Sequence, residues 1–162
     1  MADSEGGRPS AAAAPSDLKL DDYLPYRLSV AANAVSGLIA RAYQARFDLT
    51  IPQWRLIAVL GEDGLSTQQA LCARTLMDKV TVSRASAALV ERGLVLRTPN
   101  ASDRRSHRLA LTPEGAALYR QIAPSALAYE AKLLTQFSPL EQQVAMKLLR
   151  RLQLAAIDLS GD

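Results

Sequence analysis

The sequence predicts a mainly α-helical protein with one small β-hairpin, and three observations support this fold class. Apolar residues recur every three or four positions over most of the chain from Leu20 onward, which is the period of an amphipathic helix. Residues that favour the start or the end of a helix divide this pattern into separate segments. Two short segments on either side of a turn sequence are typical of strands instead.

The first 18 residues are predicted to form a disordered tail. Residues 1–16 are mostly Gly, Ser, Ala and Pro, and almost nothing in them can be buried. Asp3 and Glu5 stand where a signal peptide carries positive charge. No apolar run in the chain reaches the roughly 18 residues that span a bilayer. We therefore expect a cytoplasmic protein without a membrane partner, in which the single cysteine, Cys72, is a reduced thiol.

Two amphipathic helices are predicted in the first part of the chain. The first spans residues 25–46, because an apolar stripe runs along it and proline is favoured in a first helical turn. The second begins at Thr50, where Gln53 completes a capping box, and ends at Gly61 and Gly64.

Two shorter helices follow and are joined by a tight turn. The first is predicted to start at the capping box Ser66–Gln69 and to run to Leu76. The second spans residues 78–92, with Val82 on its internal face and Gly93 as its terminating residue. Two short helices joined in this way, the second polar and basic at its start, form a helix-turn-helix.

A hairpin and a long helix come next. Strands are predicted at 94–98 and 107–111, on either side of the turn residues 99–103. The dipeptide Thr112–Pro113 opens the long helix, in which Pro124 is expected to cause a kink.

The last helix begins at Ser138, with Pro139 in its first position and Glu141 closing a capping box. Its apolar stripe consists of Leu140, Val144, Leu148, Leu152, Ala155 and Leu159. The three long helices carry more Leu, Ala and Val than the packing of one chain needs. We therefore expect a second copy to complete their core through a two-fold axis.

Basic charge is concentrated in one segment. The whole chain has 19 basic and 16 acidic residues, which gives a formal net charge of +3. Between Arg74 and Arg108 there are eight basic and three acidic residues, so the remaining chain has 11 basic and 13 acidic ones. Charge alone is more typical of a solvated face, and it is the helix-turn-helix pattern that makes double-stranded DNA the expected partner.

Four residues at the start of the second short helix are the candidate DNA contacts there: Lys79, Thr81, Ser83 and Arg84. Lysine and arginine donate hydrogen bonds to guanine edges and phosphates, and hydroxyl groups bond to either. Lys79 can equally hold a phosphate, a contact that carries no sequence information.

The tip of the hairpin supplies a second group of candidates, Asp103, Arg104 and Arg105. A narrow minor groove attracts an inserted arginine. Asp103 can hold Arg105 in a fixed orientation through a bidentate pair.

With these segments in place, the chain resembles the MarR family of bacterial transcription regulators over about residues 20–160. The resemblance rests on Asp78–Arg84 leading into Leu89–Val95, on the wing Asp103–Thr112 and on the order of the helices. It implies a homodimeric winged helix-turn-helix protein in which the terminal helices pair the subunits. It also implies repression at a pseudo-palindromic operator, with the second short helix in the major groove and Arg105 in the adjacent minor groove. The organisation implied is a tail at 1–18, a dimerisation helix at 19–47, a winged helix-turn-helix lobe at 48–112 and dimerisation helices at 113–162.

The resemblance also places an effector pocket between the first helix, the second helix and the start of the long helix after the hairpin. The candidate lining residues are Tyr26, Arg27, Val30, Asn33, Trp54 and Arg55. Aromatic rings with an arginine suit a small aromatic carboxylate, or its coenzyme A thioester, through stacking and an ion pair. The alternative is that Trp54 belongs to the core and that Arg27 and Arg55 form ion pairs at the surface or between the lobes.

Two other functions stay open. A winged helix can bind a protein instead of DNA, which would make the chain a helical interaction protein. Cys72 can act as a redox sensor. The resemblance implies, however, that redox-sensing members carry the reactive cysteine near the start of the first helix, and this chain has Tyr23 and Tyr26 there. An enzyme is not indicated, because the sequence has no nucleophile–base set and no Gly-rich phosphate loop. One histidine, His107, and one cysteine give no ligand set for a metal, and no cofactor is expected.

Overall fold

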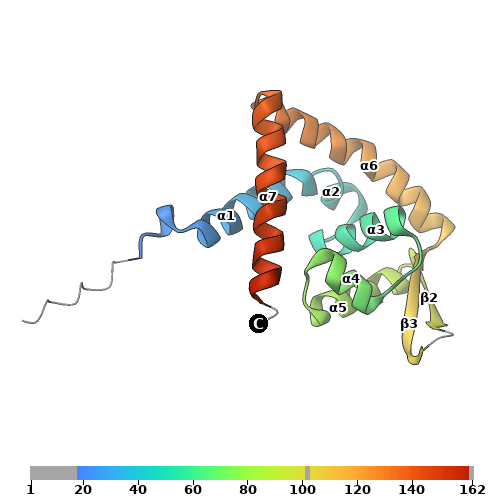
Figure 1. Ribbon diagram of the computed structural model, residues 1–162. Helices are drawn as coiled ribbons and strands as arrows, with labels where there is room; N and C mark the ends of the chain where they lie inside the picture. Colours follow the sequence, from blue (N-terminus) through green and yellow to red (C-terminus); the bar gives the residue numbers. More distant parts are fainter. Residues whose placement is uncertain (1–17, 101–102, 161–162) are drawn as a thin grey trace, which may run out of the picture. The chain divides into compact units, whose positions relative to one another are not determined.

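The computed structural model describes residues 18–100 and 103–160, apart from the side chains of Arg104 and Arg105 (Figure 1). The predicted tail at 1–18 thus lies outside the described residues except for Leu18. The chain divides into two units, Met1–Val35 and Ser36–Asp162, which are described separately. The predicted fold class is confirmed, since helices predominate and the strands form one small antiparallel sheet.

The first unit contains a single 3-10 turn, Leu20–Asp22, and most of helix α1, Leu24–Ala40. Every residue described in it is exposed, including the apolar residues Leu24, Leu28 and Val35 of the predicted stripe.

The first helix is shorter than predicted. α1 ends at Ala40, and after a turn at residues 41–43 the short helix α2, Gln44–Phe47, follows. The prediction of a continuous helix to residue 46 is therefore wrong. Tyr43 leaves the helical conformation and its side chain is buried in the core, so the apolar periodicity continues across a break in the backbone.

Helix α3, Ile51–Asp63, begins at the predicted capping box. The Thr50 amide donates to Gln53 Oε1 at 2.8 Å, and the Gln53 amide donates to Thr50 Oγ1 at 3.4 Å. Gly61 does not end the helix. α3 continues to Asp63, and Gly64 follows as its C-cap with a positive φ of 75°. A Cβ on Gly61 would lie 3.1 Å from the ring of Tyr119, so this glycine allows α3 and a later helix to approach each other.

A strand that the sequence analysis missed precedes the next helix. β1, Ser66–Thr67, is followed directly by α4, Gln68–Thr75. The capping box predicted from Ser66 is wrong, because Ser66 pairs with Leu109 in the sheet and Thr67 caps the helix by accepting from the Ala70 amide at 3.1 Å. α4 also stops one residue before the predicted end, with Leu76 in the left-handed region at φ 53°.

Helix α5, Lys79–Glu91, matches its prediction closely. Asp78 is its N-cap, and Gly93 at φ 67° follows its end. The face that α5 turns inward consists of Val82, Ala85, Ser86 and Leu89, all buried.

The sheet is larger than the predicted hairpin. Strands β2, Val95–Asn100, and β3, Asp103–Leu111, pair antiparallel, and β1 adds to the other side of β3 in the order β1-β3-β2. The predicted turn at residues 99–103 is wrong in part, because the strands include Pro99, Asn100 and Asp103. Residues 101 and 102 lie outside the described residues. The pairing of Pro99 with His107 extends the ladder up to an irregularity at Asn100.

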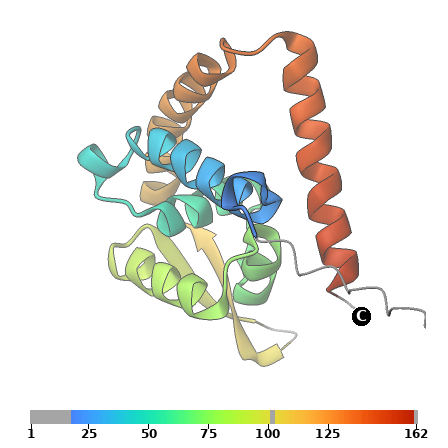
Figure 2. The ribbon, with the colours of Figure 1, turned by 90° about the vertical axis from the view of Figure 1, so that its left-hand side faces the viewer.

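The C-terminal helices are α6, Pro113–Leu134, and α7, Pro139–Leu159, joined by a short loop (Figure 2). Thr112 caps α6 by accepting from the Gly115 amide at 3.0 Å, and α6 continues past Pro124 as one helix. The capping box at Ser138 is confirmed. No residue of α7 is buried.

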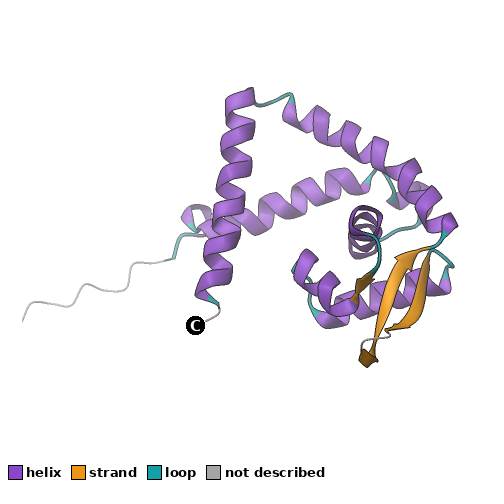
Figure 3. Ribbon diagram, turned by 45° about the vertical axis from the view of Figure 1, so that its right-hand side comes forward, coloured by secondary structure: helices purple, strands orange, loops and turns teal. Residues whose placement is uncertain are grey.

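The core of the second unit lies between α3, α4, α5, the sheet and the start of α6 (Figure 3). Its fully buried side chains include Leu56, Leu71, Leu89, Leu109 and Ile122, each from a different element. These contacts hold α4 and α5 in the helix-turn-helix arrangement.

Arg92, at the end of α5, connects this module to the α2–α3 turn. Its Nη1 and Nη2 donate to the carbonyls of Asp48 and Phe47, each at 2.7 Å. These carbonyls lie at the end of α2, where no intrahelical donor is available. We expect Arg92→Ala to lower the free energy of unfolding by about 1–2 kcal/mol.

The measurement is urea unfolding at neutral pH. Arg92→Lys is the matched variant, because a lysine keeps the charge but lacks the fork that reaches two carbonyls at once, so it should fall between wild type and alanine. Equal stability of all three proteins would contradict the role given to Arg92.

Candidate nucleic-acid interface

The outward face of α5 carries three of the predicted DNA contacts. Lys79, Ser83 and Arg84 are exposed, and they lie opposite the buried face that contains Val82. Since residues three and four positions apart share a helix face, Ser83 and Arg84 line up with Val80, one turn earlier. Val80 and Ala87 are exposed as well, and the sequence analysis did not select either.

Thr81, the fourth predicted contact on α5, takes part in capping this helix. Its amide donates to Asp78 Oδ1 at 2.8 Å and its hydroxyl donates to Asp78 Oδ2 at 2.6 Å. The hydroxyl hydrogen is therefore already used, and only the lone pairs of the oxygen are left for another partner. Thr81 is half-buried, and its bonds to the N-cap residue Asp78 fix the start of α5.

These bonds favour the charged form of Asp78. The hydroxyl of Thr81, followed by its amide, holds the pKa of the Asp78 carboxyl below its ordinary value. Because the folded pKa is lower than the unfolded one, the carboxylate stabilises the fold above the unfolded pKa of about 3.9, and this contribution is lost as the pH falls through the folded pKa. We expect Asp78→Ala to be less stable than wild type at neutral pH and the difference to narrow below roughly pH 4.

Urea unfolding of both proteins along a pH series checks this expectation. Carbon-13 titration of Asp78 in Thr81→Val, which keeps the shape of the side chain but loses the hydroxyl, should give a higher pKa than in wild type. A stability difference that stays constant down to the lowest pH would contradict the linkage.

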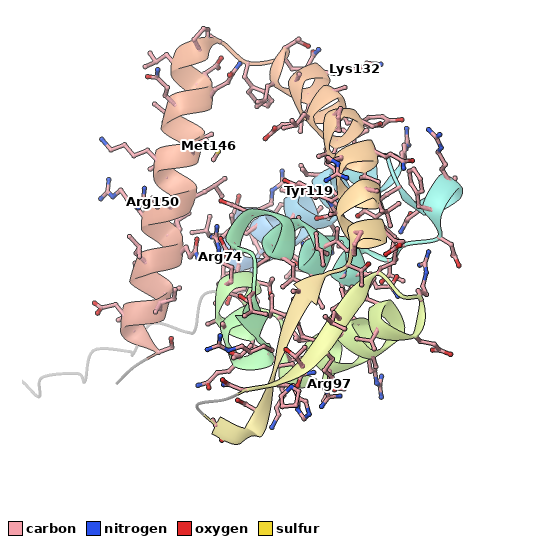
Figure 4. The ribbon with its side chains drawn as sticks, turned by 90° about the vertical axis from the view of Figure 1, so that its right-hand side faces the viewer. Arg74, Arg97, Tyr119, Lys132, Met146 and Arg150 are labelled. Carbon is pink, nitrogen blue, oxygen red and sulfur yellow. The ribbon has the colours of Figure 1, made fainter. Side chains whose placement is uncertain are left out.

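Side-chain hydrogen bonds connect the two strands of the wing. The buried Asn100 donates through Nδ2 to Ser106 Oγ at 2.8 Å and accepts from Arg108 Nε at 3.2 Å. Arg97, which projects from β2 in Figure 4, donates through Nη2 to His107 Nδ1 at 3.0 Å. These bonds join β2 and β3, so Arg97 and Arg108 stabilise the hairpin.

The tip of the wing is described only in part. Asp103 is exposed at the start of β3 and pairs with Asn100 in the ladder. Arg104 and Arg105 belong to β3, but their side chains lie outside the described residues. The predicted pair between Asp103 and Arg105 therefore stays a prediction.

The predicted effector residues fall in both units. Tyr26, Arg27, Val30 and Asn33 lie on α1 in the first unit, where all four are exposed. Arg27 Nη1 lies 4.0 Å from Asp21 Oδ1, an exposed pair of little energetic weight.

Trp54 and Arg55 lie on α3 in the second unit. The Trp54 ring stacks with Tyr43 at 5.4 Å and with Tyr119 at 6.1 Å, and it packs against the core, as the alternative interpretation expected. Arg55 is exposed and donates through Nη2 to Ser36 Oγ at 3.3 Å. Burial raises the pKa of Tyr43, and the charge of Arg55 opposes this rise.

A cavity of about 360 Å³ in the second unit was not predicted. Its lining residues are Leu60, Gly61, Gly64, Leu65, Ala110, Leu111, Ala116, Tyr119 and Arg120. Tyr119, labelled in Figure 4, is the last ring of the stack that begins at Tyr43. Gly61 and Gly64, which the sequence pattern predicts as helix ends, also leave space for this cavity because they have no side chain.

Other kinds of site find little support in the part of the chain that the structure describes. No group of His, Cys, Asp and Glu side chains there can hold a metal ion. Cys72 is a half-buried free thiol that packs against the core. None of the helices described is both long and apolar enough to cross a membrane.

Comparisons with known proteins agree with this geometry. The model of the MarR family matches residues 47–106. The transcriptional regulator HosA of Escherichia coli O127:H6 is 30% identical over 105 residues, which cover 65% of this chain and 78% of that protein. Among solved structures, a probable transcriptional regulator from Pseudomonas aeruginosa is 31% identical, with a TM-score of 0.72 and coverage of 83% of this chain and 99% of the other. The fold is also that of BpsR from Bordetella bronchiseptica, whose DNA binding is regulated by 6-hydroxynicotinic acid, at a TM-score of 0.76, 22% identity and coverage of 85% and 98%. The chain thus belongs to the MarR family of transcriptional regulators and has their winged-helix DNA-binding fold.

Proposed function

We propose that this regulator is a cytoplasmic homodimeric repressor, which binds a pseudo-palindromic operator and leaves it when a small aromatic acid or its coenzyme A thioester binds. The observation that carries the DNA-binding part is the sidedness of α5. Lys79, Ser83 and Arg84 are exposed on one face, while Val82 and Leu89 anchor the other face in the core. A helix with this division can lie in the major groove with its donors against base edges and phosphates.

The homodimer is supported by the apolar face of α7. The predicted stripe residues are exposed along the whole helix, from Leu140 at 69% to Leu159 at 78%. A contiguous apolar surface of this length is typical of a protein–protein interface. A second copy of the chain covers it most simply, and the resulting two-fold axis matches a pseudo-palindrome.

Binding of the DNA beside the protein's own gene tests this function. Fluorescence anisotropy should show tighter binding to one segment of that DNA than to a shuffled sequence. The association constant should fall steeply with salt, because each phosphate contact releases counterions. Binding without sequence preference and without salt dependence would favour the alternative of a winged helix that binds a protein.

The wing has its own test. Arg105→Ala should weaken operator binding by about fivefold or more, since an arginine inserted in a narrow minor groove contributes on the order of 1 kcal/mol or more. The dimer should stay intact in sedimentation experiments. Unchanged operator affinity would remove the wing from the DNA contact.

The effector proposal is supported by aromatic and arginine side chains and by one neighbour. The DNA binding of BpsR, which has the same fold, is regulated by 6-hydroxynicotinic acid, an aromatic acid. A ligand acts by binding the DNA-incompetent conformation more tightly than the competent one, and it shifts the equilibrium only by that difference.

Calorimetry with benzoates, cinnamates and their coenzyme A thioesters tests the effector, followed by a DNA-release assay. Arg27→Ala and Arg55→Ala should weaken binding if the effector lies against the predicted residues. Arg120→Ala, at the separate cavity, serves as the positional control and should reduce binding only if the effector occupies that cavity instead. Absence of heat with every compound would overturn the aromatic-acid proposal and leave the DNA-binding proposal intact.

A further inference from the structure

We propose that Val80 is a specificity-determining residue that contacts the methyl group of a thymine in each half-site of the operator. This inference rests on the proposed DNA-binding function and adds to it one base that the protein prefers. It depends on the exposure of Val80, on its position in α5 and on the rigidity of the helix start.

Val80 is 57% exposed, in the first turn of α5. It contributes little to the core, in contrast to Val82 two positions later, which is completely buried. Its neighbours on the outward face are Ser83 and Arg84, three and four positions along, and Ala87 continues the same row. An apolar side chain therefore stands in line with the polar groups that are proposed to contact DNA.

The start of α5 is held in one conformation. The Asp78 carboxylate accepts hydrogen bonds from both the amide and the hydroxyl of Thr81. These two bonds span Val80 and hold the first turn of the helix in place. Valine itself has one strongly preferred rotamer in a helix. Its methyl groups consequently occupy a defined position, which is what discrimination between bases requires.

The chemistry of the major groove indicates the ligand. The N-terminal residues of the second helix of a helix-turn-helix are the ones that contact base edges. Val80 has no donor or acceptor in its side chain, so it cannot read the polar edges of guanine, cytosine or adenine. Thymine is the base that presents a methyl group in this groove, and an apolar contact with it is a known mode of readout.

The position of the thymine relative to a second contact follows from helix geometry. Arg84 lies four residues after Val80, which is a rise of about 6 Å along the helix. Successive base pairs are about 3.4 Å apart along the axis. The thymine should therefore lie within about two base pairs of a guanine that Arg84 contacts.

Replacing thymine with uracil tests the contact, because uracil lacks the methyl group and is otherwise the same. The operator is first selected from a randomised DNA library with the wild-type protein, and each thymine of a half-site is then replaced in turn. For wild type, one replacement per half-site should weaken binding about three- to fivefold, as expected for one buried methyl group. For Val80→Ala, which leaves the buried face of α5 unchanged and shortens the apolar side chain, the same replacement should weaken binding less than about twofold.

Leu65→Ala is the matched control, since it removes an apolar side chain that is 52% exposed and lies outside α5. This variant should keep the full uracil penalty. If Val80→Ala also keeps the penalty, or if no thymine of the half-site shows one in wild type, the inference is overturned while the DNA-binding function stands. If the selection yields no preferred sequence for wild type, both the inference and the proposed function are overturned.

Discussion

Gly115→Ala is expected to lower the free energy of unfolding by more than about 3 kcal/mol, because the new side chain has no place to go. A Cβ at Gly115 would lie 2.0 Å from the carbonyl oxygen of Leu94 and 3.0 Å from its carbonyl carbon. That oxygen accepts a hydrogen bond from the Thr112 amide at 3.1 Å, so moving it would also break the junction between the sheet and α6. Urea unfolding followed by circular dichroism measures the loss.

Gly37→Ala is the control for this prediction. A Cβ at Gly37, in α1, meets nothing within 4 Å. Alanine there should raise the stability by about 0.5–1 kcal/mol, since glycine inside a helix is entropically unfavourable. A Gly115→Ala protein within about 1 kcal/mol of wild type would mean that the α6 start does not approach Leu94 as closely as described.

Arg84→Ala is expected to have the largest effect on DNA binding. Arg84 is exposed on the outward face of α5 and forms no ion pair among the residues described. An arginine bidentate to guanine is worth about 1–3 kcal/mol, which corresponds to roughly 5- to 150-fold in affinity for each half-site. Binding to shuffled DNA should change much less, because it depends on phosphate contacts that other basic residues also make.

Two variants make this measurement specific. Arg84→Lys keeps the charge but loses the planar fork, so most of the sequence preference should disappear while nonspecific binding is retained. Arg41→Ala removes the same charge from an exposed side chain in the turn after α1, and it should leave the preference unchanged. If Arg84→Ala still distinguishes the operator from shuffled DNA as well as wild type does, α5 does not read bases through Arg84.

Four helix starts could be predicted from the sequence because they depend on contacts between neighbouring residues. Thr50 with Gln53 and Ser138 with Glu141 form capping boxes as predicted, and Asp78 and Thr112 cap their helices. The helix ends were harder to predict. α1 stops where Tyr43 turns into the core, and Gly61 inside α3 leaves space for the ring of Tyr119 in α6. Both depend on packing against other elements, which the local sequence does not display.

For the candidate interface, the sequence predicted where its residues lie on α5, and their contact with DNA stays a prediction. The sidedness of α5 follows from the spacing of Val82, Ala85 and Leu89, which the sequence displays. The bonds of Thr81 to Asp78 depend on the distances between the folded side chains, which the sequence does not display. Strand β1 could not be predicted, because two residues are too few to show an alternation of apolar and polar side chains. The cavity beside Tyr119 could not be predicted either, because its lining comes from α3, β3 and α6, which are distant in the sequence.

The central claim is that two copies of α5 enter the major groove of one operator, and methylation interference with dimethyl sulfate tests it most directly. This reagent methylates guanine N7 in the major groove and adenine N3 in the minor groove. We predict that methylated guanines block binding in two clusters about one helical turn apart, one for each α5. Arg84→Ala should lose the interference at one guanine in each cluster. Interference at adenine N3 alone, or a single cluster of guanines, would contradict the claim.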